Sequence, residues 1–381
     1  MDTSKLAAMV EVFEGLEDWR NGQQTRHVLS ELLTVAVCAV LSGADDFEDI
    51  VQWGRAKLNW LRGFLVLDYG VASQDTFERV FAVLDPKSFE QAFGTWVGAV
   101  IPALGRDQVI AIDGKTSRRT KSKTVAPLHI VSAFAAEVGI VLGQTATAEK
   151  SNEITAIPEL LRTLDINGCI VTIDAMGTQT AIAQQIREGQ GDYVLCVKDN
   201  HPKLLESILL AHIGIEAPLI AVTSNESRSR GHGREEIRRC HAFEVSDRLY
   251  RAEQWRDIRS FAVVERTRIV GDRTSVERRH YISSLAPDAE KISHAVRSHW
   301  EVENRLHWCL DVQFGDDYAR GRSGHIAHNL ALVRHIALNL LRMDTTRKTS
   351  LKAKRLVASA SDEYRAKLLG FEPDHDEDDD D

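Results

Sequence analysis

The stretch from Gln108 to Ile213 alternates short apolar segments with helix-like segments, and this alternation restricts the fold more than any other feature. The apolar segments are rich in β-branched residues, which is typical of buried strands. They cover 108–113, 128–134, 140–145, 169–174 and 193–198, and the helical segments cover 152–164, 178–188 and 202–213. Three strands followed by helix, strand, helix and strand predict an α/β domain.

The flanking segments differ in character from this part. Residues 1–105 have helical apolar spacing, with Ser73 or Asp75 as a helix cap before the run FERVFAVL. Residues 218–285 alternate like strands and predict a β-rich insertion at about 216–288, and helices are expected from Lys291 to Leu310 and from Ile326 to Leu341. We therefore expect an all-helical N-terminal domain (1–105), an α/β domain (106–345), a basic helical segment (346–371) and an acidic tail (372–381).

The net charge of −9 is unevenly distributed along the chain. Residues 372–381 contain eight acids and no Lys or Arg, so this tail is expected to be disordered and the rest is close to neutral. Three basic clusters then favour a phosphate-binding surface over simple solvation, and the tail could compete for them or only aid solubility. The clusters are Lys115, Arg118, Arg119, Lys121 and Lys123; Arg228, Arg230, Arg234, Arg238 and Arg239; and Arg342, Arg347, Lys348, Lys352, Lys354 and Arg355.

Several other classes of protein are disfavoured by the sequence. The five cysteines are widely spaced without a CxxC pair, which argues against a disulfide framework and a zinc site. The longest apolar run, Leu32 to Leu41, is far shorter than the roughly 20 residues that span a bilayer. The N-terminus lacks the basic start and apolar core of a secretory signal. We expect a cytoplasmic, nucleoid-associated protein with no membrane partner.

Two of the predicted strands end in an aspartate followed by a small residue. Asp113 closes the run QVIAID before Gly114, and Asp174 closes CIVTID before Ala175. A carboxylate at the rim of a sheet can meet solvent or metal, whereas one in the core is costly unless paired. One such aspartate is often a cap for the next element, but a pair in one α/β domain favours a metal site.

A third acid is offered by the predicted helix near residue 300. His299, Glu303 and His307 are spaced at i, i+4 and i+8 and share one face with Trp300 alongside, while Glu301 points to roughly the opposite side. Taken alone, this pattern is equally that of an ordinary amphipathic helix. Oxygen ligands without cysteine suit Mg²⁺ (or Mn²⁺), and two such ions promote phosphoryl transfer on nucleic acids.

Short motifs follow one another in a fixed order along almost the whole chain. They are SGADDFEDIVQWG (42–54), SQDTFERVFAVLDP (73–86), AIDGK (111–115), EKSNEI (149–154), TIDAM (172–176), DYV (192–194), VKDN (197–200), HGR (232–234) and HWEVENRLHWCLDVQFGDD (299–317). Over roughly residues 15–370 the sequence resembles DDE transposases of bacterial insertion sequences. The resemblance is to the group that includes the H-repeat-associated proteins linked to Rhs elements.

This resemblance implies an α/β catalytic core of ribonuclease H-like type with a β-rich insertion, preceded by an all-helical N-terminal domain that binds DNA ends. Asp113, Asp174 and Glu303 occupy the positions of the catalytic acids, and they would bind two Mg²⁺ or Mn²⁺ ions. Val296, His299 and Leu310 stand where the wider family signature has Tyr, Arg and Lys. DNA contacts are expected from Lys115, Arg118, Arg119, Lys198, Arg234, His299, Trp300, Arg320 and Arg322.

The implied activity is metal-dependent cleavage of double-stranded DNA at the ends of a mobile element, followed by strand transfer into target DNA. A homodimer is expected on DNA because two ends must be held together. Two alternatives stay open. One is a nuclease of the same fold that does not join strands, and the other is a DNA-binding remnant without turnover, against which the intact set of three carboxylates argues.

Overall fold

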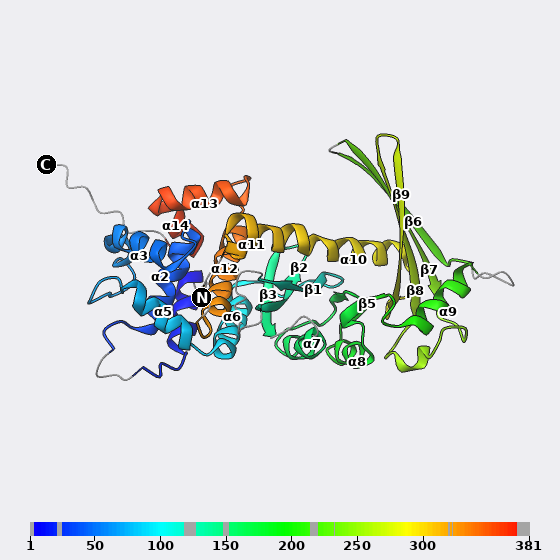
Figure 1. Ribbon diagram of the computed structural model, residues 1–381, viewed down its shortest axis with the longest axis horizontal. Helices are drawn as coiled ribbons and strands as arrows, with labels where there is room; N and C mark the ends of the chain where they lie inside the picture. Colours follow the sequence, from blue (N-terminus) through cyan, green and yellow to red (C-terminus); the bar gives the residue numbers. More distant parts are fainter. Residues whose placement is uncertain are drawn as a thin grey trace.

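The computed structural model describes residues 4–20, 25–117, 127–147, 152–213, 220–231, 233–318, 321 and 323–371. Figure 1 shows an elongated molecule with the N-terminal helices at one end, a sheet in the middle and long hairpins at the other end. The long helix α10 (Ala289–Val302) runs between the two ends along one face of the sheet (Figure 1). This arrangement places the predicted acids in the middle of the molecule.

The N-terminal part is helical, as predicted from its apolar spacing. Its helices are α1 (Lys5–Glu14), α2 (Leu29–Leu41), α3 (Phe47–Ala56), α4 (Leu58–Leu61), α5 (Gln74–Val83) and α6 (Pro86–Val100). Ser73 is the cap of α5, since its side chain accepts a hydrogen bond from the backbone N–H of Thr76. Helix α2 is buried along nearly its whole length because α12 (Ile326–Met343) packs against it.

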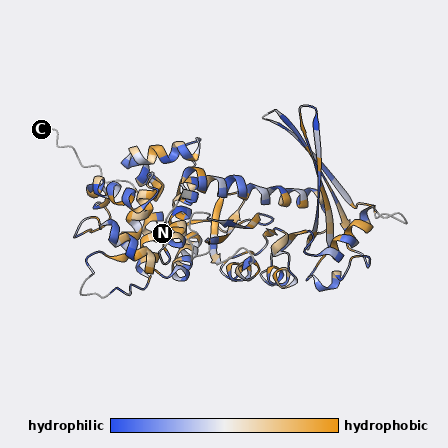
Figure 2. Cartoon of the chain, viewed as in Figure 1, coloured by the Kyte–Doolittle hydropathy of each residue, from blue (hydrophilic) through white to orange (hydrophobic). Residues whose placement is uncertain are grey.

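One mixed sheet of nine strands has the order β3-β2-β1-β4-β5-β9-β8-β7-β6. The strands of its first half are β1 (Val109–Thr116), β2 (His129–Ala135), β3 (Ile140–Thr147), β4 (Ile170–Ile173) and β5 (Asp192–Val197). Strands β1, β4 and β5 are parallel, β2 pairs antiparallel with β1, and β3 pairs antiparallel with β2, so only β2 runs against the other four. These strands are largely buried and apolar (Figure 2), as expected for strands that helices cover on both faces.

The first predicted strand does not end at Asp113, which corrects the sequence-based expectation. Strand β1 continues to Thr116, and Gly114 to Thr116 keep their pairing with β2. On its other side, the parallel pairing of β1 with β4 stops at Ile112 and Ile173. Beyond Asp113, strand β1 is therefore paired on one side only, with β2. Asp113 still lies where the parallel strands part.

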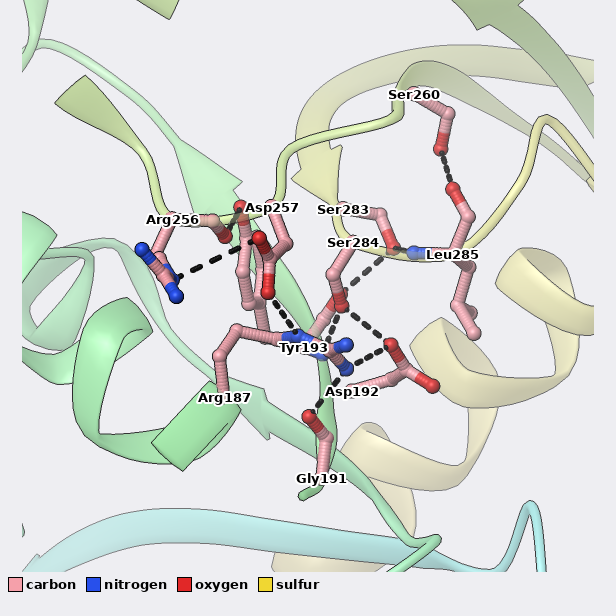
Figure 3. Close-up of polar contacts among 10 residues, drawn as sticks. All are labelled: Arg187, Gly191, Asp192, Tyr193, Arg256, Asp257, Ser260, Ser283, Ser284 and Leu285. Atoms are coloured by element: carbon pink, nitrogen blue, oxygen red, sulfur yellow. Dashed lines mark hydrogen bonds and ion pairs between the residues drawn. The ribbon is translucent and has the colours of Figure 1, made fainter. Parts of the chain in front are cut away.

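The β-rich insertion extends the same sheet. Its strands are β6 (Thr223–Gly231), β7 (Arg234–Glu244), β8 (Ser260–Val270) and β9 (Arg273–Ser283), and β9 pairs antiparallel with β5. Figure 3 shows the contacts at this junction, where the Ser283 hydroxyl donates to the Tyr193 carbonyl at 2.6 Å. Asp192 accepts from Arg187 at 2.5 Å and from the Ser284 hydroxyl at 2.8 Å. These contacts fix the insertion to the central strands.

Helices cover the two faces of the central strands. Helices α7 (Glu153–Leu161) and α8 (Thr180–Glu188) lie on the face opposite α10, and α9 (Pro202–Ile213) precedes the insertion (Figure 1). The helix predicted from Lys291 to Leu310 is interrupted, because five residues, Glu303–His307, form a π-helical segment (η6) between α10 and α11 (Trp308–Gln313). A π-helical insertion of this kind is rare and frequently marks a functional site.

The C-terminal helices pack on the N-terminal ones. Helix α12 contacts α2, α5 and α6, while α13 (Leu351–Ala360) and α14 (Asp362–Leu369) lie beside it. The basic cluster of this region is partly internal, which corrects its interpretation as a phosphate-binding surface. Arg342, Lys354 and Arg355 donate to the carbonyls of Gly139, Leu341 and Gln313, respectively. The predicted domain boundaries stay a prediction, and no helix of the described residues is long and apolar enough to cross a membrane.

Candidate active site

The two predicted aspartates lie next to each other at the point where strands β1 and β4 part. Ile112 and Ile173 are the last paired residues of these parallel strands, and Asp113 and Asp174 follow them directly. The carboxylate of Asp174 accepts a hydrogen bond from the Met176 N–H at 2.8 Å as the chain enters the short helix η4 (Ala175–Gly177). The pattern that predicted a pair of acids therefore did bring them to one place.

Glu303 is the first residue of the π-helical segment, and its side chain is exposed. Helix α10 packs over β1 and β4, so it delivers Glu303 to the same region as the aspartates. Burial raises the pKa of Asp113 to about 7, and the negative charges of Asp174, Glu153 and Glu303 add to this effect, against the backbone N–H of Gly114, which lowers it. The three predicted acids thus share one electrostatic environment, together with a fourth, Glu153.

Two histidines of the α10–α11 segment face this cluster. The Nδ1 atom of His299 lies 3.1 Å from the Thr172 hydroxyl, and the Nδ1 atom of His307 lies 3.7 Å from Oδ2 of Asp113. Burial lowers the pKa of both imidazoles to about 4, so both are neutral near pH 7. Within the described part of the chain, the Nε2 atom of His307 is buried and has no hydrogen-bond partner.

The acids fit a divalent cation in their chemistry. They offer oxygen ligands alone, which Mg²⁺ and Mn²⁺ prefer, and their mutual repulsion at Asp113 is of the kind that a cation would relieve. Among the residues that the structure describes, no three His, Cys, Asp or Glu side chains are already grouped tightly enough to hold a metal ion. The donors and their charge therefore suit the ion, and a closed set of ligands would require side chains such as Glu303 to turn inward.

Lys115 lies close to the acids but is engaged in an internal network. Its ammonium pairs with Asp311 and Asp316, each at 2.6 Å, and Asp316 also accepts from the buried Arg334 at 2.8 Å. Burial lowers the pKa of Lys115, and the negative charges of the two aspartates more than offset that effect. A contact of Lys115 with phosphate would have to displace these ion pairs. The network instead ties β1 to the segment after Glu303.

A groove rich in arginine lies between the insertion and α10 and reaches Glu303. Its volume is about 310 Å³. It is lined by Arg234, Glu236, Arg238, Val264, Arg266, Glu277, Arg279, Tyr281, Ser293, Val296, Arg297, Trp300, Glu303 and Asn304. The buried Glu236 pairs with Arg238 and Arg266, and the guanidinium of Arg279 stacks 4.0 Å from the ring centre of Trp300. Five arginines against three glutamates leave the groove positively charged.

A smaller pocket adjoins this groove and is lined by one of the two aspartates. Asp174, Lys198 and His299 line it together with Arg279 and Trp300, which also belong to the groove. Of the positions predicted to contact DNA, Lys198, Arg234, His299 and Trp300 therefore lie around one continuous surface. Arg118, Arg119, Arg320 and Arg322 are outside the described residues.

Alternate side chains of a strand point to opposite faces of the sheet, and this divides the basic cluster of β6 and β7. Arg234 and Arg238 face the groove, while Arg228, Arg230 and Arg239 pair with Glu226 and Glu235. The sequence reasoning missed Arg266, Arg279 and Arg297, which come from β8, β9 and α10. Two of them are brought to the groove by the pairing of β7, β8 and β9, in which Arg238 pairs with Arg266 and Val264 pairs with Arg279. The reasoning also missed that the Glu153 side chain is buried.

Two family models match the chain, a DDE_Tnp_1-associated domain over residues 10–97 and a transposase DDE domain over residues 104–340. The "H repeat-associated putative transposase YhhI" of Escherichia coli (strain K12) is 37% identical, and the match covers 96% of this chain and 98% of that protein. The "Putative transposase YncI" of Escherichia coli O157:H7 is 36% identical, and the match covers 96% and 95% of the two chains.

Among solved structures, the piggyBac transposase synaptic complex with hairpin DNA matches with a TM-score of 0.46 and 12% identity. This match covers 97% of the chain described here and 77% of the other, and the likeness is too weak to support a conclusion. The family rests on the sequence matches, which span most of the chain and agree with each other. On these grounds, the chain belongs to the DDE transposase family, in the group of the H-repeat-associated proteins.

Proposed function

We propose that this chain is an active transposase, which cuts double-stranded DNA at the ends of a mobile element and joins the freed strand to target DNA. Asp113, Asp174 and Glu303 are the catalytic acids of this proposal, with Mg²⁺ or Mn²⁺ as cofactor. The strand order β3-β2-β1-β4-β5, in which β2 runs antiparallel to the other four strands, supports a ribonuclease H-like core.

The observation that carries the proposal is that the arginine groove is lined by Glu303 and adjoins a pocket lined by Asp174. Guanidinium groups bind phosphate oxygens in a bidentate manner, and a DNA backbone requires such positive charge over several nucleotides. The groove reaches Glu303, and the adjoining pocket reaches Asp174. A backbone held by Arg234, Arg238 and Arg266 would therefore be led towards the acids that act on it.

Each group has a distinct part in this proposal. The arginines bind and orient the DNA backbone, and the Trp300 side chain, which Arg279 holds from above, offers an aromatic face at the inner end of the groove. The carboxylates would hold two divalent ions, which activate the attacking oxygen and stabilise the leaving oxygen. The neutral His299 is hydrogen-bonded to Thr172 and keeps helix α10 in place over β4.

The helical N-terminal part (1–105) is proposed to bind the element ends, and a homodimer is proposed to hold two ends together. A nuclease without strand joining would use the same acids, so the site geometry does not separate the two activities. A DNA-binding remnant is disfavoured because all three acids are present and lie at one place.

Strand joining is the step that distinguishes these functions. Wild-type protein would be incubated with Mg²⁺ or Mn²⁺, labelled duplex from the gene's own flanks and an unlabelled target duplex, with Asp174→Asn as the inactive control. A transposase yields labelled strands covalently joined to the target, and Asp174→Asn yields none. Cleavage without joining identifies a nuclease, and binding without cleavage in both proteins identifies a remnant.

A further inference from the structure

A buried pair of side chains, His129 and Glu153, lies directly beside Asp113 and has no part in the proposed function so far. His129 is 1% exposed and Glu153 is 5% exposed. The Nε2 atom of His129 lies 2.6 Å from Oε1 of Glu153, and its Nδ1 atom lies 2.8 Å from the Thr116 hydroxyl. Strand β1 thus provides Thr116 at one end of a hydrogen-bonded chain that ends in the carboxylate on α7.

This pair packs on the backbone of the residue that follows Asp113. A Cβ atom at Gly114 would fall far inside the van der Waals contact distance of both His129 Nε2 and Glu153 Oε1. Gly114 has an ordinary strand conformation, since it pairs with Val131 within β1 and β2. The glycine is therefore required at this position for space, and that space is taken by the carboxylate and the imidazole.

The pair brings a buried carboxyl group into the site. The two ring nitrogens of His129 bridge the Thr116 hydroxyl and the Glu153 carboxyl group, which fixes the position of that carboxyl group beside Gly114. Within the described part of the chain, no Lys or Arg forms an ion pair with Glu153. Burying a carboxylate is unfavourable unless a cation lies near it. Glu153 is also one of the three acids that raise the pKa of Asp113.

A second, largely buried side chain from another element, His307, also approaches Asp113. His307 approaches Asp113 to 3.7 Å from the π-helical segment, and its Nε2 atom is buried without a partner in the described residues. Buried polar atoms in native proteins nearly always have a partner. Glu153 from α7 and His307 from the π-helical segment therefore both lie close to Asp113, and the His307 ring has one nitrogen near this carboxylate and the other without a partner in the described residues.

We propose that Glu153, held by His129 and Thr116, is a fourth acidic residue of the candidate active site, and that it strengthens the binding of divalent cations by the three predicted acids. This inference rests on the proposed function, because it assigns Glu153 a part in the same metal site. Glu153 is a positioning residue: it acts through its charge and through the backbone of Gly114. The motif SNEI is then part of the site, because its glutamate starts α7 with the side chain directed inward.

The test is an isothermal calorimetric titration of the full-length protein with Mn²⁺ at pH 8 in the absence of DNA. Glu153→Gln keeps the shape and removes the charge, and Glu159→Gln on the outer side of the same helix is the matched control. Groups that support metal ligands typically contribute about ten- to hundredfold in affinity. We expect Glu153→Gln to weaken Mn²⁺ binding by about tenfold and Glu159→Gln to leave it unchanged.

Three outcomes separate this inference from the function on which it rests. If wild type binds Mn²⁺, Asp174→Asn does not, and Glu153→Gln binds like wild type, the inference is overturned and the proposed function stands. If wild type does not bind Mn²⁺, both are overturned. Should Glu153→Gln fail to fold, as judged by circular dichroism, Thr116→Val decides instead. Loss of its hydroxyl frees His129 and should weaken Mn²⁺ binding a few-fold, and unchanged binding would overturn the inference.

Discussion

Replacing Asp113 with Asn should make the metal-free protein more stable at pH 8, although it removes a proposed catalytic acid. Burial and three neighbouring acids raise the pKa of Asp113 to about 7, whereas an unfolded chain has a value near 3.8. The folded state therefore retains a proton between about pH 4 and pH 7 that the unfolded state has lost. Its stability falls as the pH rises through this window and stays lower above pH 7.

The size of this effect follows from the difference between the two pKa values. A change from 3.8 to about 7 corresponds to about 4 kcal/mol in the free energy of unfolding at pH 8. The Asp113 side chain is 23% exposed, so water screens part of the repulsion and we expect about half of that value. The neutral amide that replaces the carboxylate carries no such penalty. The Asp113→Asn variant should therefore gain about 2 kcal/mol at pH 8 and almost nothing at pH 4.

The assay is urea unfolding in the presence of a chelator, monitored by circular dichroism at pH 8 and at pH 4. Asp68→Asn is the control, because Asp68 is exposed and its replacement should change the free energy of unfolding by less than about 0.5 kcal/mol. A variant that is no more stable than wild type at pH 8 would refute the reasoning. An equal gain at both pH values would also refute it, since the charge would then not be the cause.

Three further predictions concern the surroundings of the site. Arg334→Met should lower the free energy of unfolding by about 3–5 kcal/mol, because it leaves the buried Asp316 with one partner fewer. The control, Arg228→Met at an exposed position, should change it by less than about 0.5 kcal/mol, and similar losses for both variants in urea unfolding would contradict a stabilising role for the Arg334–Asp316 pair. Arg279→Ala should weaken DNA binding and reduce the salt dependence of the binding constant by about one phosphate contact. Arg273→Ala, at the distant end of the hairpin, should change neither, and equal effects of the two variants in fluorescence anisotropy would contradict DNA binding in the groove. Deletion of residues 372–381, which lie outside the described residues, should leave cleavage intact and tighten nonspecific DNA binding at low salt. Weaker binding after the deletion would contradict the idea that the acidic tail competes with DNA for basic surfaces.

The two aspartates could be brought together from the sequence because the end of an apolar run is a local property, although β1 itself continues to Thr116. Each follows an apolar run, and the carboxyl ends of neighbouring parallel strands lie at one edge of a sheet. Glu303 was harder, since its spacing is equally that of an amphipathic helix, and the resemblance to a family decided it. The π-helical segment at Glu303 leaves no signal in the apolar pattern, because it changes the backbone register by one residue without changing the residue types.

The remaining parts of the site depend on tertiary pairing. Arg238, Arg266 and Arg279 are neighbours because β7, β8 and β9 pair in one register, and a run of basic residues in β7 alone sends alternate side chains to opposite faces. In the sequence, strands β2 and β3 lie between Asp113 and Glu153, and the partner of Glu153, His129, lies on β2. Lys115 was expected to bind phosphate, yet two aspartates that are distant in the sequence hold it inside the protein.

The most direct test of the central claim is DNA cleavage by single variants of the three acids. Wild type, Asp113→Asn, Asp174→Asn and Glu303→Gln would be compared on duplex DNA from the gene's flanks with Mg²⁺ or Mn²⁺, and Glu301→Gln, on the other side of the same helix, would serve as control. The account predicts that each of the three variants binds the DNA and does not cut it, while wild type and Glu301→Gln cut at the ends. Cleavage by any of the three variants at the wild-type rate would show that its carboxylate has been misassigned.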